Sequence, residues 1–262
     1  MALSPEMIET LATRLENAYE KATAIPKITD EYPDLTIDEA FAIQYRLRER
    51  KIAQGHKIVG LKMGLTSWAK MKQMGVSSPS YAFLSDDYSV PEGATIRCAE
   101  LIHPRVEAEI AFVTKKTIQG PGCHIAAVLA ATDYVIPALE IIDSRYENFR
   151  FDLPSVIADN ASSARFVVGG ISREVDGLDL KTIGVVLEKN GEVVETGAGA
   201  AVLGHPAASV AMLANMLAAR GESIPEGCLI LTGGITAAVA AKTGDTLTAR
   251  YQGLGSVSVR FV

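Results

Sequence analysis

Apolar and polar positions alternate along many short stretches of the chain, with the period that is typical of half-buried β-strands. The clearest of these stretches is residues 103–112, in which the apolar side chains at even positions share one face. Two patterns with helical spacing precede every strand signal. The order of elements therefore predicts an α+β protein, with an N-terminal helical lobe at residues 1–55 and a mixed β core at residues 56–262.

Both predicted helices begin with a capping signal. Ser4 is followed by Pro5, a residue that suits the first position of a helix. Thr36 and Glu39 have the spacing of a capping box, and the helix that follows them is expected to end near Gly55. The two caps predict where each helix begins.

Turn residues separate the remaining elements. Asn190-Gly191 lies between two strand-like stretches and predicts a two-residue hairpin. Residues 79–93 are predicted to form a loop, and residues 68–74 a short segment that is capped by Thr66 or Ser67. The Asn190-Gly191 hairpin spans residues 185–194. The other predicted elements are strands at 57–64, 137–142, 165–168, 229–231, 246–251 and 256–262, and helices at 125–131 and 207–219.

Three glutamates occupy positions where a negative charge is unusual. Glu107 and Glu109 are two residues apart on one face of a predicted strand, roughly 7 Å along an extended chain. Glu140 interrupts a second apolar run, where an unpaired anion is costly to bury. Three such carboxylates with no Cys or His pattern beside them favour an oxygen-preferring cation such as Mg²⁺ or Mn²⁺. Spacing alone leaves the alternative open, namely a solvent-facing edge strand with Glu140 paired to Arg105 or Arg145.

Composition and charge exclude several classes of protein. Of the 262 residues, 48% are hydrophobic and 21% are charged, as in an ordinary soluble globular protein. The net charge of −6 argues against a general nucleic-acid binder. The sequence predicts neither a membrane span nor a signal peptide. Cys98, Cys123 and Cys228 show neither a disulfide framework nor metal-ligand spacing, so we expect thiols of a reducing compartment and a cytoplasmic protein.

Other site motifs are weak or missing. No Gly-x-Gly-x-x-Gly or Walker phrase follows a predicted strand, and there is no Gly-x-Ser-x-Gly elbow. None of the four histidines shows ligand spacing. Lys62 lies in an apolar strand, where it either reaches solvent or is held near an anion. Gly233 and Gly234 follow another strand and allow either a close approach to a ligand carboxylate or a simple bend.

Four phrases together resemble the fumarylacetoacetate hydrolase superfamily, in particular its hydratase and decarboxylase branch. The resemblance covers nearly the whole chain, and the phrases follow the order and spacing of the family. A Glu-x-Glu pair combined with a distant Glu is specific, whereas the glycine phrases alone are not. The phrases are residues 60–67 with Lys62, residues 105–112 with Glu107 and Glu109, residues 138–145 with Glu140, and residues 231–236 with Gly234 and Thr236.

This resemblance implies a fold and a site. The fold is a mixed β-roll or β-sandwich core of the C-terminal type of this superfamily, with a helical lobe before it. The site binds Mg²⁺ or Mn²⁺ through Glu107, Glu109 and Glu140, and Lys62 is catalytic. Arg145 either holds a departing carboxylate or is a structural partner of Asp143. The other implied residues are Ser162 and Ser163 in a small polar loop, as catalytic residues, and Thr66, Ser67, Gly234 and Thr236 in substrate binding.

Two activities of the branch fit this chain. The hydratases are expected to carry an acidic residue directly after a proline, at a position that is Ser80 here. The phrase at residues 62–76 also looks more like the decarboxylases. The resemblance therefore favours metal-dependent decarboxylation of 4-oxalocrotonate (2-oxo-3-hexenedioate) to 2-hydroxypenta-2,4-dienoate, in the meta-cleavage pathway of aromatic catabolism. The alternative is the hydratase that adds water to this dienoate.

The chemistry agrees with this preference. A decarboxylase chiefly needs an electron sink, which a divalent ion supplies as a Lewis acid, whereas a hydratase must move protons on and off carbon. Lys62 would add positive charge where negative charge grows. Hydrolysis of an acylpyruvate ranks third, because no His–carboxylate pair lies beside the lysine phrase. The resemblance also implies a homo-oligomer and a complex with the pathway hydratase, in which a scaffolding role is the non-enzymatic alternative.

Overall fold

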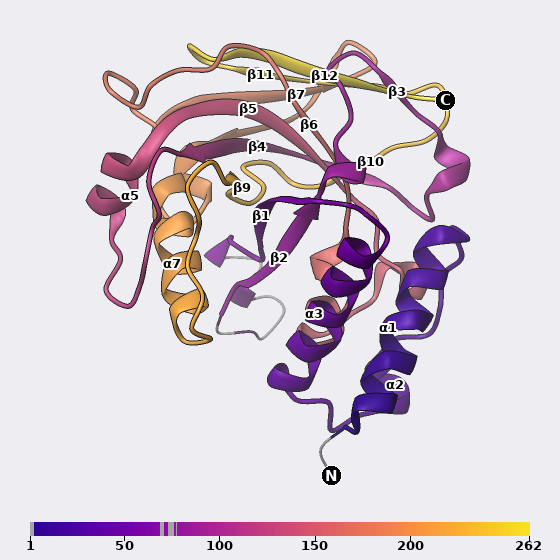
Figure 1. Cartoon of the computed structure of the whole chain (residues 1–262). Helices are drawn as coiled ribbons and strands as arrows, with labels where there is room; N and C mark the ends of the chain where they lie inside the picture. The colour runs from indigo at the N-terminus through magenta and orange to yellow at the C-terminus, as the bar shows by residue number, and fades with distance from the viewer. Residues whose placement is uncertain (1–2, 69–70, 73–75, 77) are drawn as a thin grey trace.

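Two β-sheets lie one above the other and form the body of the chain, with helices beneath the larger sheet (Figure 1). This computed structural model describes residues 3–68, 71–72, 76 and 78–262. The sheets are curled, and the three helices at the N-terminal end precede the first strand. The predicted fold class, a mixed β core with N-terminal helices, is therefore confirmed.

The larger sheet carries the candidate site. Its strands are β1 (Ile58–Gly64), β2 (Ser80–Ser85), β4 (Arg105–Thr114), β5 (Thr132–Ile142), β6 (Ser163–Val168), β9 (Leu229–Leu231) and β10 (Val239–Ala240). They lie in the order β2-β1-β9-β4-β5-β6, and β10 also pairs with β4. All of these pairs are antiparallel except that of β1 with β9. Since β9 and β10 pair with different parts of β4, the residues between them form a loop beside the middle of that strand.

The smaller sheet has five strands and packs against β5 of the larger sheet (Figure 1). They are β3 (Thr95–Ile96), β7 (Gly184–Lys189), β8 (Glu192–Ala198), β11 (Thr246–Tyr251) and β12 (Gly255–Phe261), in the order β3-β12-β11-β7-β8. Asn190 and Gly191 join β7 to β8 with φ of +56° and +86°, which confirms the predicted hairpin. The Tyr251 hydroxyl donates to the carbonyl of Ala138 at 2.7 Å and links the two sheets.

The N-terminal helices are α1 (Pro5–Glu20), α2 (Ile28–Glu31) and α3 (Ile37–Ala53), which lie together beside the larger sheet (Figure 1). Both predicted caps are confirmed. The Ser4 hydroxyl accepts the backbone N–H of Met7, and Thr36 and Glu39 form a reciprocal capping box. Buried residues of α1 and α3, such as Leu11, belong to the same apolar cluster as the sheet. The boundary at residue 55 stays a prediction.

The later helices are α5 (Ile125–Ala131), α6 (Leu153–Ala158) and α7 (Pro206–Ala218). Short 3-10 turns are η1 (Asp86–Tyr88), η2 (Cys98–Glu100), η3 (Glu147–Phe149), η4 (Asn160–Ser162) and η5 (Gly199–Ala201). Gly199–Ala218 is long and apolar enough to cross a membrane by composition, but 56% of its most apolar window is buried within the fold. Val210, Leu213 and Leu217 of α7 pack into the main apolar cluster, so α7 has the character of a core helix.

The loop predicted at residues 79–93 is wrong in its first half. Ser80–Ser85 forms β2, which pairs antiparallel with β1, and all six of its residues are buried. A strand that is buried on both faces has no polar alternation, and this one lies between a proline and two aspartates that suggest turns. The segment predicted at residues 68–74 lies partly outside the described residues.

Candidate metal centre and active site

The register of the larger sheet brings the three predicted metal-binding glutamates together. Glu107 of β4 lies directly opposite Glu140 of β5, and Glu109 follows two residues later on the same face of β4. A carboxylate oxygen of each lies within 4.8 Å of the other two. Like charges that face each other across two strands destabilise a sheet. A cation between them removes this repulsion.

Two oxygen atoms of this group are buried without a partner. Glu109 and Glu140 are both 0% exposed. Glu109 Oε1 and Glu140 Oε2 make no hydrogen bond within the described residues. Burial, together with the charges of Glu140 and Glu107, holds the pKa of Glu109 well above its ordinary value. Burial also raises the pKa of Glu140, although Lys62 acts in the opposite direction.

Lys62 of β1 supplies positive charge to this group. It aligns with Leu231 of β9, which pairs with Ala111 of β4, so Lys62 lies on the same face of the sheet as the glutamates. Its ammonium lies 2.5 Å from Glu140 Oε1 and donates to the carbonyl of Ala161 at 2.9 Å. The side chain is 2% exposed. Of the two interpretations of this lysine, the structure therefore supports the one in which an anion holds it.

The two glycines after β9 allow the backbone to approach the carboxylates. The N–H of Gly233 donates to Glu109 Oε2 at 2.7 Å. Gly233 has a φ of +105°, and a Cβ there would lie 2.0 Å from Thr66 Oγ1. A Cβ on Gly234 would lie 2.9 Å from the carboxylate carbon of Glu107. Gly233 therefore requires glycine, whereas a side chain at Gly234 would displace the Glu107 carboxylate.

The polar loop predicted at residues 160–163 contains a left-handed turn. Asn160, Ala161 and Ser162 have φ of +47°, +48° and +57°, a conformation that costs roughly 1–2 kcal/mol for each non-glycine residue. The Asn160 amide stabilises the turn by accepting the N–H of Phe83 and donating to its carbonyl, both at 3.1 Å. The turn directs the Ala161 carbonyl to Lys62 and places Ser162 on the wall of the cavity described below. Strain of this kind is concentrated at functional sites.

Arg145 stabilises this turn through buried contacts with the residues that flank it. Its guanidinium forms a buried ion pair with Asp159 and also donates to the carbonyls of Asp143, at 2.7 Å, and Ser163, at 2.9 Å. Arg145 is 4% exposed and does not line the cavity. The structure therefore favours a structural role for Arg145, and its carboxylate partner is Asp159 instead of the predicted Asp143.

A cavity of about 550 Å³ opens beside the carboxylates. Of the predicted residues, Lys62, Thr66, Ser67, Glu107, Ser162 and Gly234 line it. Ser163 and Thr236 are buried outside its wall, where Thr236 Oγ1 accepts the N–H of Ala108 at 3.3 Å. Sequence motifs predict no site role for the lining residues Arg105, Phe149 and Phe151. Arg105 and Glu107 are two residues apart, so they share one face of β4. This shared face is the sequence signal that points to Arg105 as a site residue.

Comparisons with known proteins agree with this geometry. The family described as fumarylacetoacetate (FAA) hydrolase, C-terminal, matches residues 61–262. The chain belongs to this family. It is 63% identical over 260 residues to a 4-oxalocrotonate decarboxylase of Pseudomonas putida, covering 99% of this chain and 98% of the relative. It is 41% identical over 258 residues to a 2-oxo-hept-4-ene-1,7-dioate hydratase of Escherichia coli, covering 96% and 97%.

A solved structure is similar over the same length. It is 4-oxalocrotonate decarboxylase from Pseudomonas putida G7 in complex with magnesium and adipate, with a TM-score of 0.98, 60% identity and 99% coverage of both chains. Within this fumarylacetoacetate hydrolase fold, the carboxylates of our chain fit a divalent ion. Carboxylate oxygens are the ligands that Mg²⁺ prefers, and Glu109 Oε1 and Glu140 Oε2 are buried oxygens that make no hydrogen bond in the part of the chain that the structure describes.

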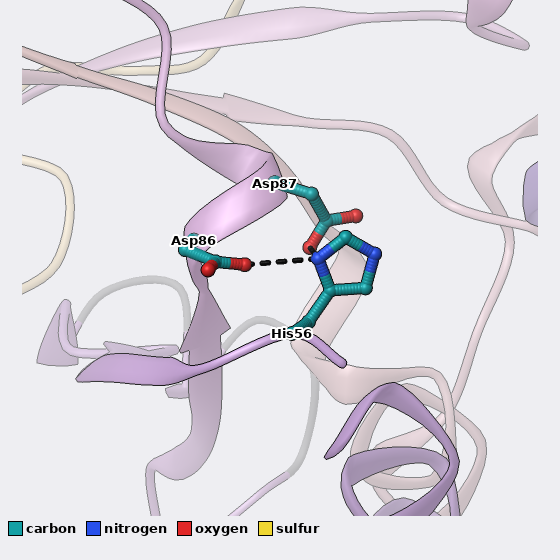
Figure 2. A group of neighbouring side chains, drawn as sticks. All are labelled: His56, Asp86 and Asp87. Atoms are coloured by element: carbon teal, nitrogen blue, oxygen red, sulfur yellow. Dashed lines mark hydrogen bonds and ion pairs between the residues drawn. The ribbon is translucent and has the colours of Figure 1, made fainter. Parts of the chain in front are cut away.

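A second group of potential ligands lies at the end of β2, outside this family site. His56, Asp86 and Asp87 point toward one another (Figure 2). His56 Nδ1 lies 3.0 Å from Asp86 Oδ1, and the Lys51 ammonium lies 2.6 Å from Asp87 Oδ2. All three residues are only half-buried. Ion pairs within the chain already supply positive charge here, so this group joins the end of α3 to β2.

Proposed function

We propose that this chain catalyses the divalent-metal-dependent decarboxylation of 4-oxalocrotonate (2-oxo-3-hexenedioate) to 2-hydroxypenta-2,4-dienoate. The observation that carries the proposal is a cluster of three carboxylates with Lys62, in which Glu107 and Lys62 line one cavity. The 63% identity to a 4-oxalocrotonate decarboxylase over nearly the whole chain supports the choice of reaction. The relative crystallised with magnesium and adipate supports a site for a metal and a six-carbon dicarboxylate.

Glu107, Glu109 and Glu140 would hold the metal, with Mg²⁺ or Mn²⁺ as the candidates. The bound ion would act as a Lewis acid for the C1 carboxylate and the C2 oxygen of the substrate. The bond between C5 and C6 breaks, C6 leaves as CO₂, and the electron pair moves through C4 and C3 to the C2 oxygen. A proton on this oxygen completes the dienol. The negative charge therefore grows at the end of the substrate that the glutamate site binds.

Lys62 stabilises this growing charge. Its ammonium is already oriented by Glu140 and by the Ala161 carbonyl, so it needs no reorganisation during the reaction. An ammonium has three N–H groups, and these two contacts leave one for the C2 oxygen of a substrate in the cavity. Ser162, Ser67 and Thr66 on the cavity wall are suited to orient the substrate carboxylate through their hydroxyls. The side chains of Ser163 and Thr236 do not line the cavity. They would act indirectly, by positioning the residues beside them.

The hydratase of the same pathway is the second candidate. The relatives at 38–41% identity include five hydratases, and these are less similar than the decarboxylase at 63%. Ser80 lies on the cavity wall at the position where the hydratases are expected to carry an acid. Its hydroxyl is buried and has no hydrogen-bond partner among the described residues. A hydroxyl with the ordinary acidity of serine is a poor proton donor to carbon, which favours the decarboxylase.

Further features follow from the same proposal. We expect a homo-oligomer, a complex with the pathway hydratase and a cytoplasmic location. The free thiols of Cys98, Cys123 and Cys228 support a reducing compartment. Size measurement of the purified chain, with and without the hydratase, tests the assembly.

The purified chain tests the reaction directly. It is mixed with Mg²⁺ and 2-oxo-3-hexenedioate, with and without EDTA, and CO₂ release is followed together with dienol absorbance. We expect CO₂ release that EDTA abolishes. No CO₂ release, with rapid consumption of 2-hydroxypenta-2,4-dienoate, would identify the hydratase instead.

A further inference from the structure

The cavity wall presents two cationic side chains within the described residues, and they differ in what they contact. Lys62 lies at the buried end and is bound to Glu140 and to the Ala161 carbonyl. Arg105 is exposed and lies at the first position of β4. Its side chain makes no hydrogen bond or ion pair with any described residue. Its guanidinium N–H groups are therefore available to a ligand.

The acid that follows the register partner of Arg105 is already occupied. Arg105 pairs in register with Ile142, and Asp143 follows Ile142 directly. Both oxygens of Asp143 accept backbone N–H groups, from Ile102 at 2.8 Å and from His103 at 2.7 Å. Asp143 thus stabilises the turn that enters β4 and leaves the guanidinium without a carboxylate partner.

An aromatic ring fixes the position of this guanidinium. Its central carbon lies 4.5 Å from the centroid of Phe149, a residue that also lines the cavity. Phe149 has a φ of +59°, which is uncommon for an aromatic residue, and its ring packs 5.0 Å from that of His103. Stacking on a ring occupies the face of a guanidinium and leaves its N–H edge for a planar anion.

We propose that Arg105 binds the carboxylate of the substrate that lies farthest from the metal, and so selects a dicarboxylate over a monocarboxylate. Arg105 and Glu107 are two residues apart on one face of β4, roughly 7 Å along the strand. This separation suits an extended six-carbon chain with its 2-oxo acid end at the glutamates. The inference rests on the proposed function, since it assigns the other end of the same substrate.

This role predicts that loss of Arg105 affects substrate binding and turnover to different degrees. The far carboxylate carries a full negative charge when the substrate binds and loses it as CO₂ forms. The contact with Arg105 is therefore stronger in the ground state than in the transition state. Loss of Arg105 should raise KM much more than it lowers kcat. Arg105 would be a specificity residue that places the leaving group.

The test compares two ligands that differ only in the far carboxylate. 2-Oxohexanedioate and 2-oxohexanoate are titrated by calorimetry into the Mg²⁺-loaded full chain, because neither has the conjugated double bond that decarboxylation needs. The proteins are wild type, Arg105→Gln, Arg105→Lys and Arg250→Gln. Arg250 lies on β11 in the smaller sheet and is paired with Glu188, so Arg250→Gln removes the same charge away from the cavity.

We expect wild type to prefer the diacid by about tenfold or more, and Arg105→Gln to lose that preference while 2-oxohexanoate binding changes by less than about twofold. Arg105→Lys should keep part of the preference, and Arg250→Gln all of it. An unchanged preference in Arg105→Gln, or an equal loss for both ligands, overturns the inference. The proposed function is scored separately, by CO₂ release from wild type, so either idea can fail alone.

Discussion

Two groups of potential metal ligands differ in burial and in how their charge is balanced. At the Glu107, Glu109 and Glu140 group, two of the carboxylates are fully buried, and each has an oxygen that makes no hydrogen bond within the described residues. At the His56, Asp86 and Asp87 group, the residues are half-buried, the His56 ring contacts Asp86 and the Lys51 ammonium pairs with Asp87 (Figure 2). Asp87 Oδ1 also makes no hydrogen bond among the described residues, but the other oxygen of this carboxylate has the Lys51 charge beside it. Both groups have ligand atoms close enough for an ion.

The difference shows which observations identify a metal centre. Proximity of acidic side chains is common at protein surfaces, where it is stabilised by water and by lysine or arginine. Burial removes this water, and the free-energy cost of burying the charge then remains unless a bound ligand offsets it. The glutamate group also borders a cavity that can admit substrate. The proposed function therefore places catalysis at the glutamate group and a structural role at the histidine group.

The largest expected effect is on turnover. Glu107→Gln removes one ligand and one charge from the glutamate group, and we expect kcat to fall by at least about 10²–10³-fold because charge stabilisation in the transition state is lost. Steady-state CO₂ release with saturating Mg²⁺ measures it. Asp87→Asn is the matched control in the histidine group and should stay within about twofold of wild type. Equal losses in both variants would show that the comparison is mistaken.

The next effect is the response of stability to Mg²⁺. An ion that binds only the folded chain stabilises it by about 2.7 kcal/mol at a hundredfold excess over Kd. Thermal unfolding with and without Mg²⁺ should show this increase in wild type and in Asp86→Asn. Glu109→Gln should show little of it, because the ligand oxygen with no other partner becomes part of a neutral amide. A response that disappears in Asp86→Asn but persists in Glu109→Gln would transfer the metal to the histidine group.

The pH dependence of the metal-free protein should have opposite signs at the two groups. Glu109 has a folded-state pKa raised by burial and by Glu140, so its folded state holds a proton that the unfolded state loses first. Its contribution to stability falls as pH rises above the ordinary glutamate pKa. For Asp86, burial acts to raise the pKa, but hydrogen bonds from His56 and the backbone outweigh it and lower the pKa. Its contribution is present above its ordinary pKa and is lost as pH falls.

Urea unfolding at pH 5 and pH 8 in EDTA checks these signs. Glu109→Gln keeps an acceptor for the Gly233 N–H and removes the charge. We expect it to gain stability relative to wild type at pH 8 and to gain less at pH 5. Asp86→Asn should lose stability at both values, since both lie above the ordinary aspartate pKa. A Glu109→Gln variant that is less stable than wild type at pH 8 would contradict the assignment of unrelieved burial.

Local sequence pattern was enough to predict the ligands but not all of their surroundings. Glu107, Glu109 and Glu140 stand out because a charge in an apolar strand conflicts with its neighbours, and such conflicts mark functional sites. Lys62 stands out for the same reason. The metal-binding interpretation competed with a solvent-facing edge strand, and only the register that places Glu107 opposite Glu140 separates them.

The surroundings depend on contacts that no local pattern encodes. The left-handed turn at residues 160–162 is made of ordinary residues and is stabilised by Asn160 and Phe83, which are far apart in sequence. Arg105 follows the alternation of β4, but the aromatic ring that positions it comes from a 3-10 turn after β5. The local pattern predicts a loop where β2 forms, because a strand buried on both faces lacks the alternating signal.

The smallest effect should come from a methyl group beside Glu107. Gly234 has no positive φ, so Gly234→Ala keeps the backbone, but its Cβ would lie 2.9 Å from the Glu107 carboxylate carbon and would push that ligand away. We expect Mg²⁺ affinity to fall by about tenfold, as for other changes that misorient a ligand, while the metal-free melting temperature changes little. Gly184→Ala is the control, because the nearest atom to its Cβ is 3.8 Å away. Unchanged Mg²⁺ binding in Gly234→Ala would mean that the position of the Glu107 carboxylate does not matter, and would leave Glu109 and Glu140 as the ligands that distinguish this group from the histidine group.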